Sequence, residues 1–114
     1  MSAPTCLFCK IVSGELRSEV VAETEQSFAF RDIEPVAPVH VLVVPRRHVQ
    51  DLAELVEYAD ELVDLIDLAA TVADEEGLDR GWRLLSNTGS EAGQQVYHAH
   101  VHVIGGRQMS WPPG

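Results

Sequence analysis

The chain has 114 residues, 46% of them hydrophobic, and its 18 acidic against 8 basic residues give a formal net charge of −10. The length predicts a single domain, residues 1–114, and the composition excludes a disordered chain. The acidic balance argues against a nucleic-acid-binding protein, and no apolar run reaches the roughly 18 residues of a membrane span.

The chain begins Met-Ser-Ala-Pro-Thr-Cys, without the basic start and apolar stretch of a signal peptide, so we expect a cytoplasmic protein. Cys6 to Gly14 is predicted as a short helical turn with Phe8, Ile11 and Val12 on its apolar face. Strands are expected next along the chain, the first two as a hairpin and the third after a proline-rich loop: Val20 to Glu23, Ser27 to Arg31 and Val39 to Val44.

Asp51 is a candidate N-cap for a short helix through Leu55, and a long helix is predicted from Tyr58 to Glu76, ended by Gly77. Its apolar residues recur at three- and four-residue steps and predict one buried stripe: Leu62, Leu65, Ile66, Ala69, Ala70 and Ala73. Two further strands are expected over Trp82 to Ser86 and Tyr97 to Ile104. The order of elements predicts an α+β fold, with a mostly antiparallel five-stranded sheet covered by the long helix.

Three of the five histidines stand at alternate positions, His98, His100 and His102. Residues two apart on a strand share a face, so the three imidazoles are expected on one side and Ala99, Val101 and Val103 on the other. Imidazole serves as metal ligand, nucleophile, acid or base. The stripe alone therefore leaves two hypotheses open, a metal site and metal-free catalysis.

A polar, glycine-rich loop from Asn87 to Gln95 leads into the histidine strand. Gly89 and Gly93 let the backbone come close to a ligand and turn N–H groups toward an anion, and Asn87, Gln94 or Gln95 can add donors. An anion site beside three imidazoles indicates phosphoryl transfer. The alternative for the loop is an ordinary turn between two strands.

The segment His-Ala-His-Val-His-Val, residues 98–103, resembles the signature of the histidine triad (HIT) superfamily of nucleotide hydrolases and transferases. The likeness covers nearly the whole chain, and its C-terminal segment resembles the Hint branch, the purine nucleoside phosphoramidases. The further segments that carry it are Phe30 to Ile33, Pro38 to Pro45, Arg47-His48, Asn87, Gly93-Gln94, Tyr97-His98, Gly105 to Met109 and Trp111 to Gly114.

The resemblance implies a HIT-like fold, a homodimer and a mechanism that requires no cofactor. His100 would attack the α-phosphorus of a purine nucleoside 5′-phosphoramidate or related adenylate, and water would release the nucleoside monophosphate from the nucleotidyl-histidine. His102 would bind the phosphate and help protonate the leaving amine, with His98 and His40 completing the network.

The resemblance also assigns the nucleotide-binding residues. Asp32 would accept from the ribose hydroxyls, and Trp111 would reach the site of the other subunit. The base would lie among Phe8, Leu16, Phe30 and Ile33, and the phosphate among Asn87, Gly93, Gln95 and Val96.

Cys6 and Cys9 form a C-x-x-C pair, which in the cytosol indicates metal or redox chemistry more than a structural disulfide. If His48 and His98 converge on the pair, the four residues make a Cys₂His₂ site for a structural zinc, as in some members of the wider superfamily. The alternative is a reduced pair without metal.

The sequence leaves the roles of two positions undecided and is compatible with two other functions. Gln95 stands where Hint proteins commonly carry serine, which bears on the leaving group, and Arg31 either alters base preference or is a solvated charge. The chain could instead be a nucleotide-binding regulatory HIT protein with little catalysis, or a zinc-binding module. The intact His100 favours the enzyme over the first, and Asp32 with the glycine-rich loop is unexplained by the second.

Overall fold

The computed structural model describes residues 5–114. Residues 1–4, on which part of the signal-peptide argument rests, lie outside the described residues. Within the described part, no helix is long and apolar enough to cross a membrane.

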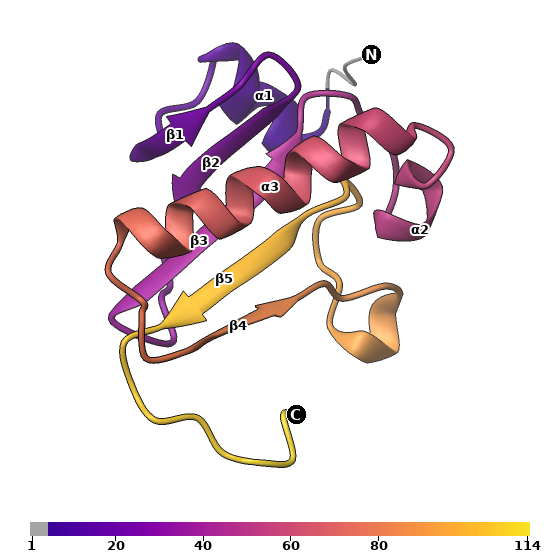
Figure 1. Ribbon diagram of the computed structural model, residues 1–114. Helices are drawn as coiled ribbons and strands as arrows, with labels where there is room; N and C mark the ends of the chain where they lie inside the picture. Colours follow the sequence, from indigo (N-terminus) through magenta and orange to yellow (C-terminus); the bar gives the residue numbers. More distant parts are fainter. Residues whose placement is uncertain (1–4) are drawn as a thin grey trace.

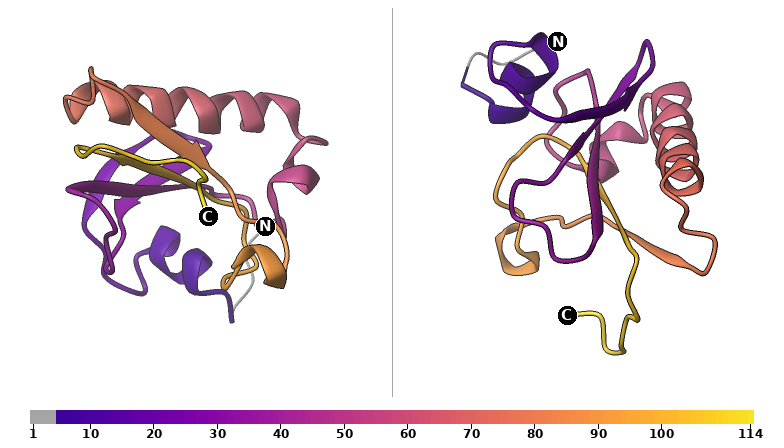
Figure 2. Two further views of the ribbon diagram at one scale, coloured as in Figure 1. Left: turned by 90° about the horizontal axis from the view of Figure 1, so that it is seen from below. Right: turned by 90° about the vertical axis from the view of Figure 1, so that its left-hand side faces the viewer.

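Five antiparallel strands form one sheet in the order β1-β2-β3-β5-β4, which confirms the predicted α+β fold (Figure 1). The long helix α3 covers one face of the sheet and the short helix α1 lies over the other (Figure 2). The elements are α1 Leu7–Ser13, β1 Val20–Glu23, β2 Ser27–Arg31, β3 Val39–Pro45, α2 Leu52–Leu55, α3 Ala59–Glu75, β4 Trp82–Leu85, the 3₁₀ turn η1 Ser90–Ala92 and β5 Val101–Gly105.

The central strand β3 is buried on both faces because its alternate residues enter two different cores. Val41 and Val43 belong to the core beneath α3, whereas Leu42 and Val44 belong to a smaller aromatic core with Phe8 of α1. His40 shares the face of Leu42, so the fold directs this imidazole toward the α1 side of the sheet.

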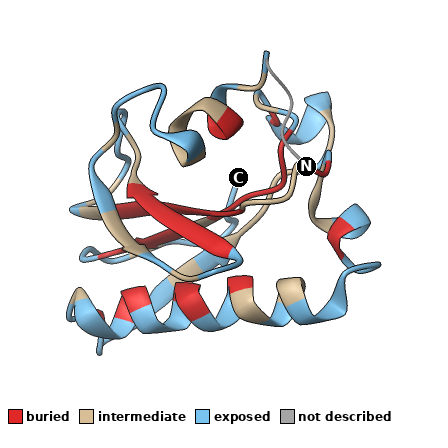
Figure 3. Cartoon of the chain, turned by 90° about the horizontal axis from the view of Figure 1, so that it is seen from above, coloured by how far each residue is buried: buried red, intermediate tan, exposed pale blue. Residues whose placement is uncertain are grey.

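Helix α3 matches the predicted range, and Figure 3 shows its buried residues facing the sheet. The predicted stripe was wrong for Ile66 and Ala70, which are exposed, while Leu68 and Val72 are buried in their place. Apolar residues occur on more than one side of α3, so their spacing alone does not determine which side is buried. The side that contacts the sheet is the buried one.

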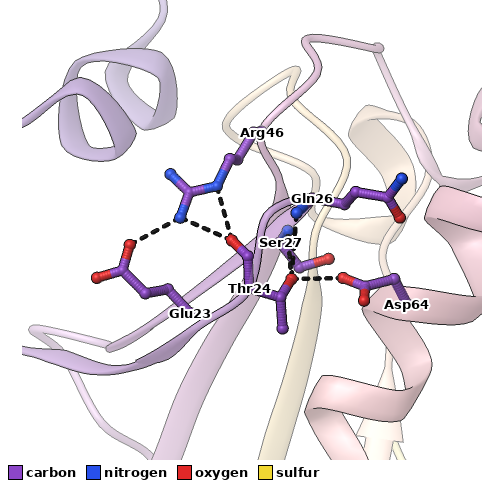
Figure 4. Close-up of polar contacts among 6 residues, drawn as sticks. All are labelled: Glu23, Thr24, Gln26, Ser27, Arg46 and Asp64. Carbon is purple, nitrogen blue, oxygen red and sulfur yellow. Dashed lines mark hydrogen bonds and ion pairs between the residues drawn. The ribbon is translucent and has the colours of Figure 1, made fainter.

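The turn between β1 and β2 is tied to α3 and to the end of β3 (Figure 4). The hydroxyl of Thr24 donates to Asp64 on α3 at 2.6 Å and accepts from the Ser27 N–H at 2.9 Å. Arg46, which directly follows β3, donates to the Thr24 carbonyl and to Glu23 at 2.7 Å. These bonds fix the chain just before His48.

The strand predicted from Tyr97 to Ile104 begins only at Val101, so His98 and His100 precede β5. Their backbone groups bond outside the strand ladder: the Ala99 N–H donates to Val49, and the His100 carbonyl accepts from the Ser86 hydroxyl at 2.7 Å. The alternation of side chains persists nonetheless, because Ala99, Val101 and Val103 lie in the core beneath α3 and Phe8 packs against His98 and His100.

Candidate functional site

A pocket of about 350 Å³ lies on the α1 side of the sheet, and His100 and His102 form part of its lining. Of the predicted nucleotide-binding residues it brings together Phe8, Leu16, Phe30, Asp32, Ile33, Asn87, Gly93, Gln95 and Val96. The sequence argument missed further lining residues, namely Leu7, Ile11, Arg17, Ser18 and Leu42. The alternation along β3 could have found Leu42, which shares the face of His40.

Trp111 does not line this pocket, and 82% of its surface is exposed. His98 and His40 also stand outside the lining, and both are buried behind it. The three alternate histidines therefore differ in place: two face the pocket and one does not.

The main chain of His98 orients the ring of His100. Its Nδ1 lies 2.7 Å from the main-chain carbonyl of His98, so the ring donates its proton there and Nε2 keeps a lone pair. The ring meets Phe8 edge to face at a centroid distance of 5.0 Å. Burial lowers the pKa of His100, although the bond to the His98 carbonyl opposes this shift. A neutral imidazole with one unprotonated nitrogen is what a nucleophile requires.

His102 has the opposite arrangement. Nδ1 of His40 accepts the Val36 N–H at 3.1 Å, so neutral His40 carries its proton on Nε2 and donates it to His102 Nδ1 at 2.9 Å. His102 must then be protonated on Nε2, which is buried and lacks a hydrogen-bond partner among the described residues. Burial, with smaller contributions from the nearby His100 and His40, lowers its pKa to about 4. The two histidines that line the pocket thus have opposite tautomers, with an unprotonated Nε2 on His100 and an Nε2–H on His102.

Asp32 lies at the other end of this network. Its Oδ1 accepts the Glu34 N–H at 2.8 Å, which fixes the carboxylate, and its Oδ2 lies 3.3 Å from His40 Nε2. Asp32, His40 and His102 together have the donor set of a metal site. The bond from Val36 argues against metal here, because it occupies the one His40 nitrogen that would have to carry the proton if Nε2 bound an ion.

The loop from Asn87 to Gln95 is closed by hydrogen bonds of its own. The N–H groups of Gly89 and Gly93 donate within the loop, to Gln94 Oε1 and to the Ser90 carbonyl, so these two N–H groups are already paired. Both glycines have φ near 90°, and this conformation closes the turns around η1. Asn87, Gly93 and Gln95 still line the pocket.

Gln94 and Gln95, which the sequence argument could not tell apart, have different roles. Gln94 is buried, and its amide accepts from Gly89 N–H and donates to the carbonyls of Gln50 and Val96. Gln95 is exposed at the pocket. The first holds the loop in place, and the second is available to a ligand.

Arg31 lines the pocket wall, but its charge is neutralised by two carboxylates. The guanidinium makes a two-bond pair with Glu76 at 2.8 and 3.0 Å, and its Nε donates to Glu19 at 3.2 Å. This tie joins β2 to the end of α3. It favours a structural role over the hypothesis that Arg31 alters base preference.

A second cluster lies behind the pocket and contains the sulfurs of Cys6 and Cys9 and the Nδ1 atoms of His48 and His98, all within 4.8 Å of one another. The two nitrogens are 3.2 Å apart, and His98 Nδ1 is 3.4 Å from Cys6 Sγ and 3.5 Å from Cys9 Sγ. Tetrahedral zinc with its usual bond lengths would separate two nitrogen ligands by about 3.3 Å and a nitrogen from a sulfur by about 3.6 Å. The four residues fit zinc.

The protonation state of His98 agrees with this fit. Its Nε2 donates to the Pro45 carbonyl at 2.7 Å, which leaves the lone pair on Nδ1, the atom that faces the cysteines. Burial lowers the pKa of His98 to about 4, so the ring is neutral near pH 7, as a ligand must be.

Comparisons with known proteins find similar sequences and structures along most of the chain. The sequence model of the HIT domain family matches residues 13–109. A "14 kDa zinc-binding protein" of Brassica juncea is 47% identical over 113 residues, covering 95% of this chain and 98% of its own. "Adenylylsulfatase HINT1" of Arabidopsis thaliana is 48% identical over 115 residues, covering 98% and 78%. The crystal structure of a HIT family hydrolase from Legionella pneumophila Philadelphia 1 has a TM-score of 0.93 at 45% identity, covering 96% of this chain and all of that one.

Proposed function

Because this chain belongs to the HIT domain family, whose relatives include hydrolases, we propose that it hydrolyses purine nucleoside 5′-phosphoramidates or related adenylates at the α-phosphorus. The observation that carries the proposal is the pair of ring nitrogens in the pocket. His100 offers an unprotonated Nε2, because its Nδ1–H is bound to His98, and His102 offers an Nε2–H.

In the first half-reaction, His100 Nε2 forms a bond to phosphorus and the bond from phosphorus to the leaving nitrogen breaks. The leaving nitrogen keeps the electron pair and takes up one proton, which His102 Nε2–H delivers while solvent water replaces it, so the ring stays neutral. In the second half, a water oxygen bonds to phosphorus and the electron pair of the broken P–Nε2 bond returns to His100. That water releases one proton to solvent, which balances the one taken up, and the products are amine and nucleoside monophosphate.

The pocket has suitable surroundings for each part of a nucleotide. The aromatic and aliphatic side chains of Phe8, Leu16, Phe30 and Ile33 supply apolar walls for a purine, and Asp32 supplies a carboxylate for the ribose hydroxyls. The phosphate would lie between the histidines and a group on the loop made up of Asn87, Gly93, Gln95 and Val96.

The name of one relative widens the range of leaving groups. By its name, the Arabidopsis thaliana adenylylsulfatase acts on adenylyl sulfate, which is a mixed anhydride and not a phosphoramidate. The attack by His100 is the same for both, and only the group that departs differs. We therefore include adenylyl sulfate among the candidate substrates, and Gln95 is the pocket residue we expect to influence this choice.

We propose that Cys6, Cys9, His48 and His98 bind a structural zinc ion. The ion would tie the start of α1 to the segment that precedes β5, and it would supply no step of the reaction. Two zinc-binding thiolates must be reduced, which agrees with the cytoplasmic location we propose.

We also propose a homodimer. The outer strand β4 leaves one edge of the sheet unpaired, and Trp82 and Leu84 on it are 38% and 37% exposed. Pairing of this edge with a second copy would cover both side chains. The exposed Trp111 is the residue that we propose to contribute to the partner's site.

The direct test is release of AMP from adenosine 5′-phosphoramidate and from adenylyl sulfate, followed for the intact protein and for His100→Ala. We expect turnover of at least one substrate by the intact protein and a loss of at least about 10³-fold in the variant. Binding of AMP without turnover of either substrate would favour the regulatory, nucleotide-binding alternative.

A further inference from the structure

Asp32 occupies a position that a ribose ligand alone does not explain. Its Oδ1 is fixed by the Glu34 N–H at 2.8 Å, and its Oδ2 faces His40 Nε2 at 3.3 Å. His40 Nε2 in turn lies 2.9 Å from His102 Nδ1. One carboxylate oxygen therefore borders both the pocket and the bond that sets the protonation of His102.

The proton on His40 Nε2 has two acceptors within reach. Because Val36 N–H occupies the other ring nitrogen at 3.1 Å, His40 has only this one proton to give while it is neutral. Donation to His102 Nδ1 keeps the His102 proton on Nε2. Donation to Asp32 would leave His102 Nδ1 without a donor. Because protons on both facing nitrogens would clash at 2.9 Å, His102 could then reach the tautomer in which Nε2 is an acceptor, unsuited to a phosphate oxygen or leaving amine, only as the two rings separate.

The donor tautomer of His102 is held by a single bond. Nε2 has no partner among the described residues, so only the bond from His40 to Nδ1 keeps the proton on Nε2. Competition from Asp32 Oδ2 for the His40 proton weakens this bond. A group that occupied Asp32 Oδ2 would remove the competing acceptor and keep the His40 proton on His102.

We propose that Asp32 is a positioning residue which couples the ribose hydroxyls, through His40, to the proton-donating state of His102. This inference rests on the proposed function, in which those hydroxyls donate to Asp32. When they do so, Asp32 Oδ2 is saturated and the His40 proton goes to His102. The ribose then accelerates the chemical step, in addition to whatever it contributes to binding.

The kinetic test compares adenosine 5′-phosphoramidate with its 2′,3′-dideoxy analogue in single-turnover release of the amine. We expect loss of both hydroxyls to lower the saturating rate at least fivefold in the intact protein. In Asp32→Asn, which keeps an oxygen for the Glu34 N–H, the two substrates should differ less than twofold at saturation. Glu25→Gln, which removes the same charge from an exposed turn residue, should behave as the intact protein.

An effect of the hydroxyls on half-saturating concentration alone, with equal saturating rates, would overturn the coupling while leaving the proposed function intact. A second measurement does not depend on turnover. Nitrogen-15 NMR of labelled imidazoles should show AMP raising the Nε2–H population of His102 and 2′,3′-dideoxy-AMP failing to do so. The same population with both nucleotides would also overturn the inference, whereas absence of amine release by the intact protein would reject the proposed reaction instead.

Discussion

The main-chain carbonyl of His98 accepts the Nδ1–H of His100 at 2.7 Å, while the ring of His98 belongs to the cysteine–histidine cluster. One residue therefore joins the candidate metal site to the candidate nucleophile. The ring fixes where the backbone of residue 98 lies, and the backbone fixes which nitrogen of His100 is unprotonated. This link explains how a structural ion outside the pocket can influence the geometry within it.

Zinc content is the first prediction. Protein purified without chelator should contain about one zinc per chain, and Cys9→Ser should lose most of it. Since a ligand bound at a hundred times its Kd contributes roughly 2.7 kcal/mol, we expect the variant to unfold at least about 10 °C lower. Metal analysis and a thermal melt measure the two effects. A wild-type protein that contains no zinc, and whose melting temperature does not rise when zinc is added, would reject the site.

The stability of the protein should depend on pH through His102. Its pKa is about 4 in the folded state against an ordinary 6.5, so between these values the unfolded chain binds the extra proton. The contribution of His102 to the free energy of unfolding is fully present above pH 6.5. It is lost as the pH falls from 6.5 toward 4, by at most about 1.4 kcal/mol per pH unit.

In His102→Asn the side-chain amide can still bond to His40 but cannot titrate. Urea unfolding at several pH values between 7 and 4 should therefore show a shallower decline for the variant than for the intact protein. Parallel curves for the two proteins would show that His102 is not the group responsible.

Gln94 and Gln95 form a matched pair for testing the loop. Gln94→Ala leaves the Gly89 N–H and the carbonyls of Gln50 and Val96 without their side-chain partner, and we expect a loss of about 1 to 3 kcal/mol and a raised KM. Gln95→Ala should leave stability within about 0.5 kcal/mol and change the relative kcat/KM for different leaving groups. Equal destabilisation by both substitutions would contradict the division of roles.

Arg31 should affect stability and not base preference. Arg31→Ala removes the paired bonds to Glu76 and leaves that half-buried carboxylate unmatched, so we expect a loss of about 1 to 2 kcal/mol. The ratio of kcat/KM for guanosine and adenosine phosphoramidates should stay within twofold. A large change in this ratio with unaltered stability would return Arg31 to the base pocket.

Local patterns predicted much of the fold and failed where distant segments decide the outcome. The hairpin, the Asp51 cap and the antiparallel sheet follow from turn residues and alternation. Ile66 and Ala70 were placed on the wrong side of α3 because helical spacing alone does not reveal which apolar side meets the sheet. The predicted strand includes His98 and His100 because the bonds that replace the ladder, from the Ala99 N–H to the Val49 carbonyl and from the Ser86 hydroxyl to the His100 carbonyl, involve other parts of the chain.

In the candidate site, too, local patterns were predictable and contacts between distant segments were not. The histidine spacing and the apolar residues of the pocket were recognisable in the sequence, partly through a family resemblance. The opposite tautomers of His100 and His102 were not, since each depends on a bond to a residue that only the folded chain brings near. The separation of Gln94 from Gln95 depends in the same way on carbonyls of Gln50 and Val96.

Attack of His100 Nε2 on phosphorus would leave a covalent adenylyl group on the protein, which intact-mass spectrometry of a rapidly quenched reaction can detect. During turnover of adenosine 5′-phosphoramidate, the intact protein should gain a single adenylyl group that fragmentation places on His100. His100→Asn should gain none and release no AMP. An adenylyl group on another residue, or turnover that persists in His100→Asn, would contradict the account.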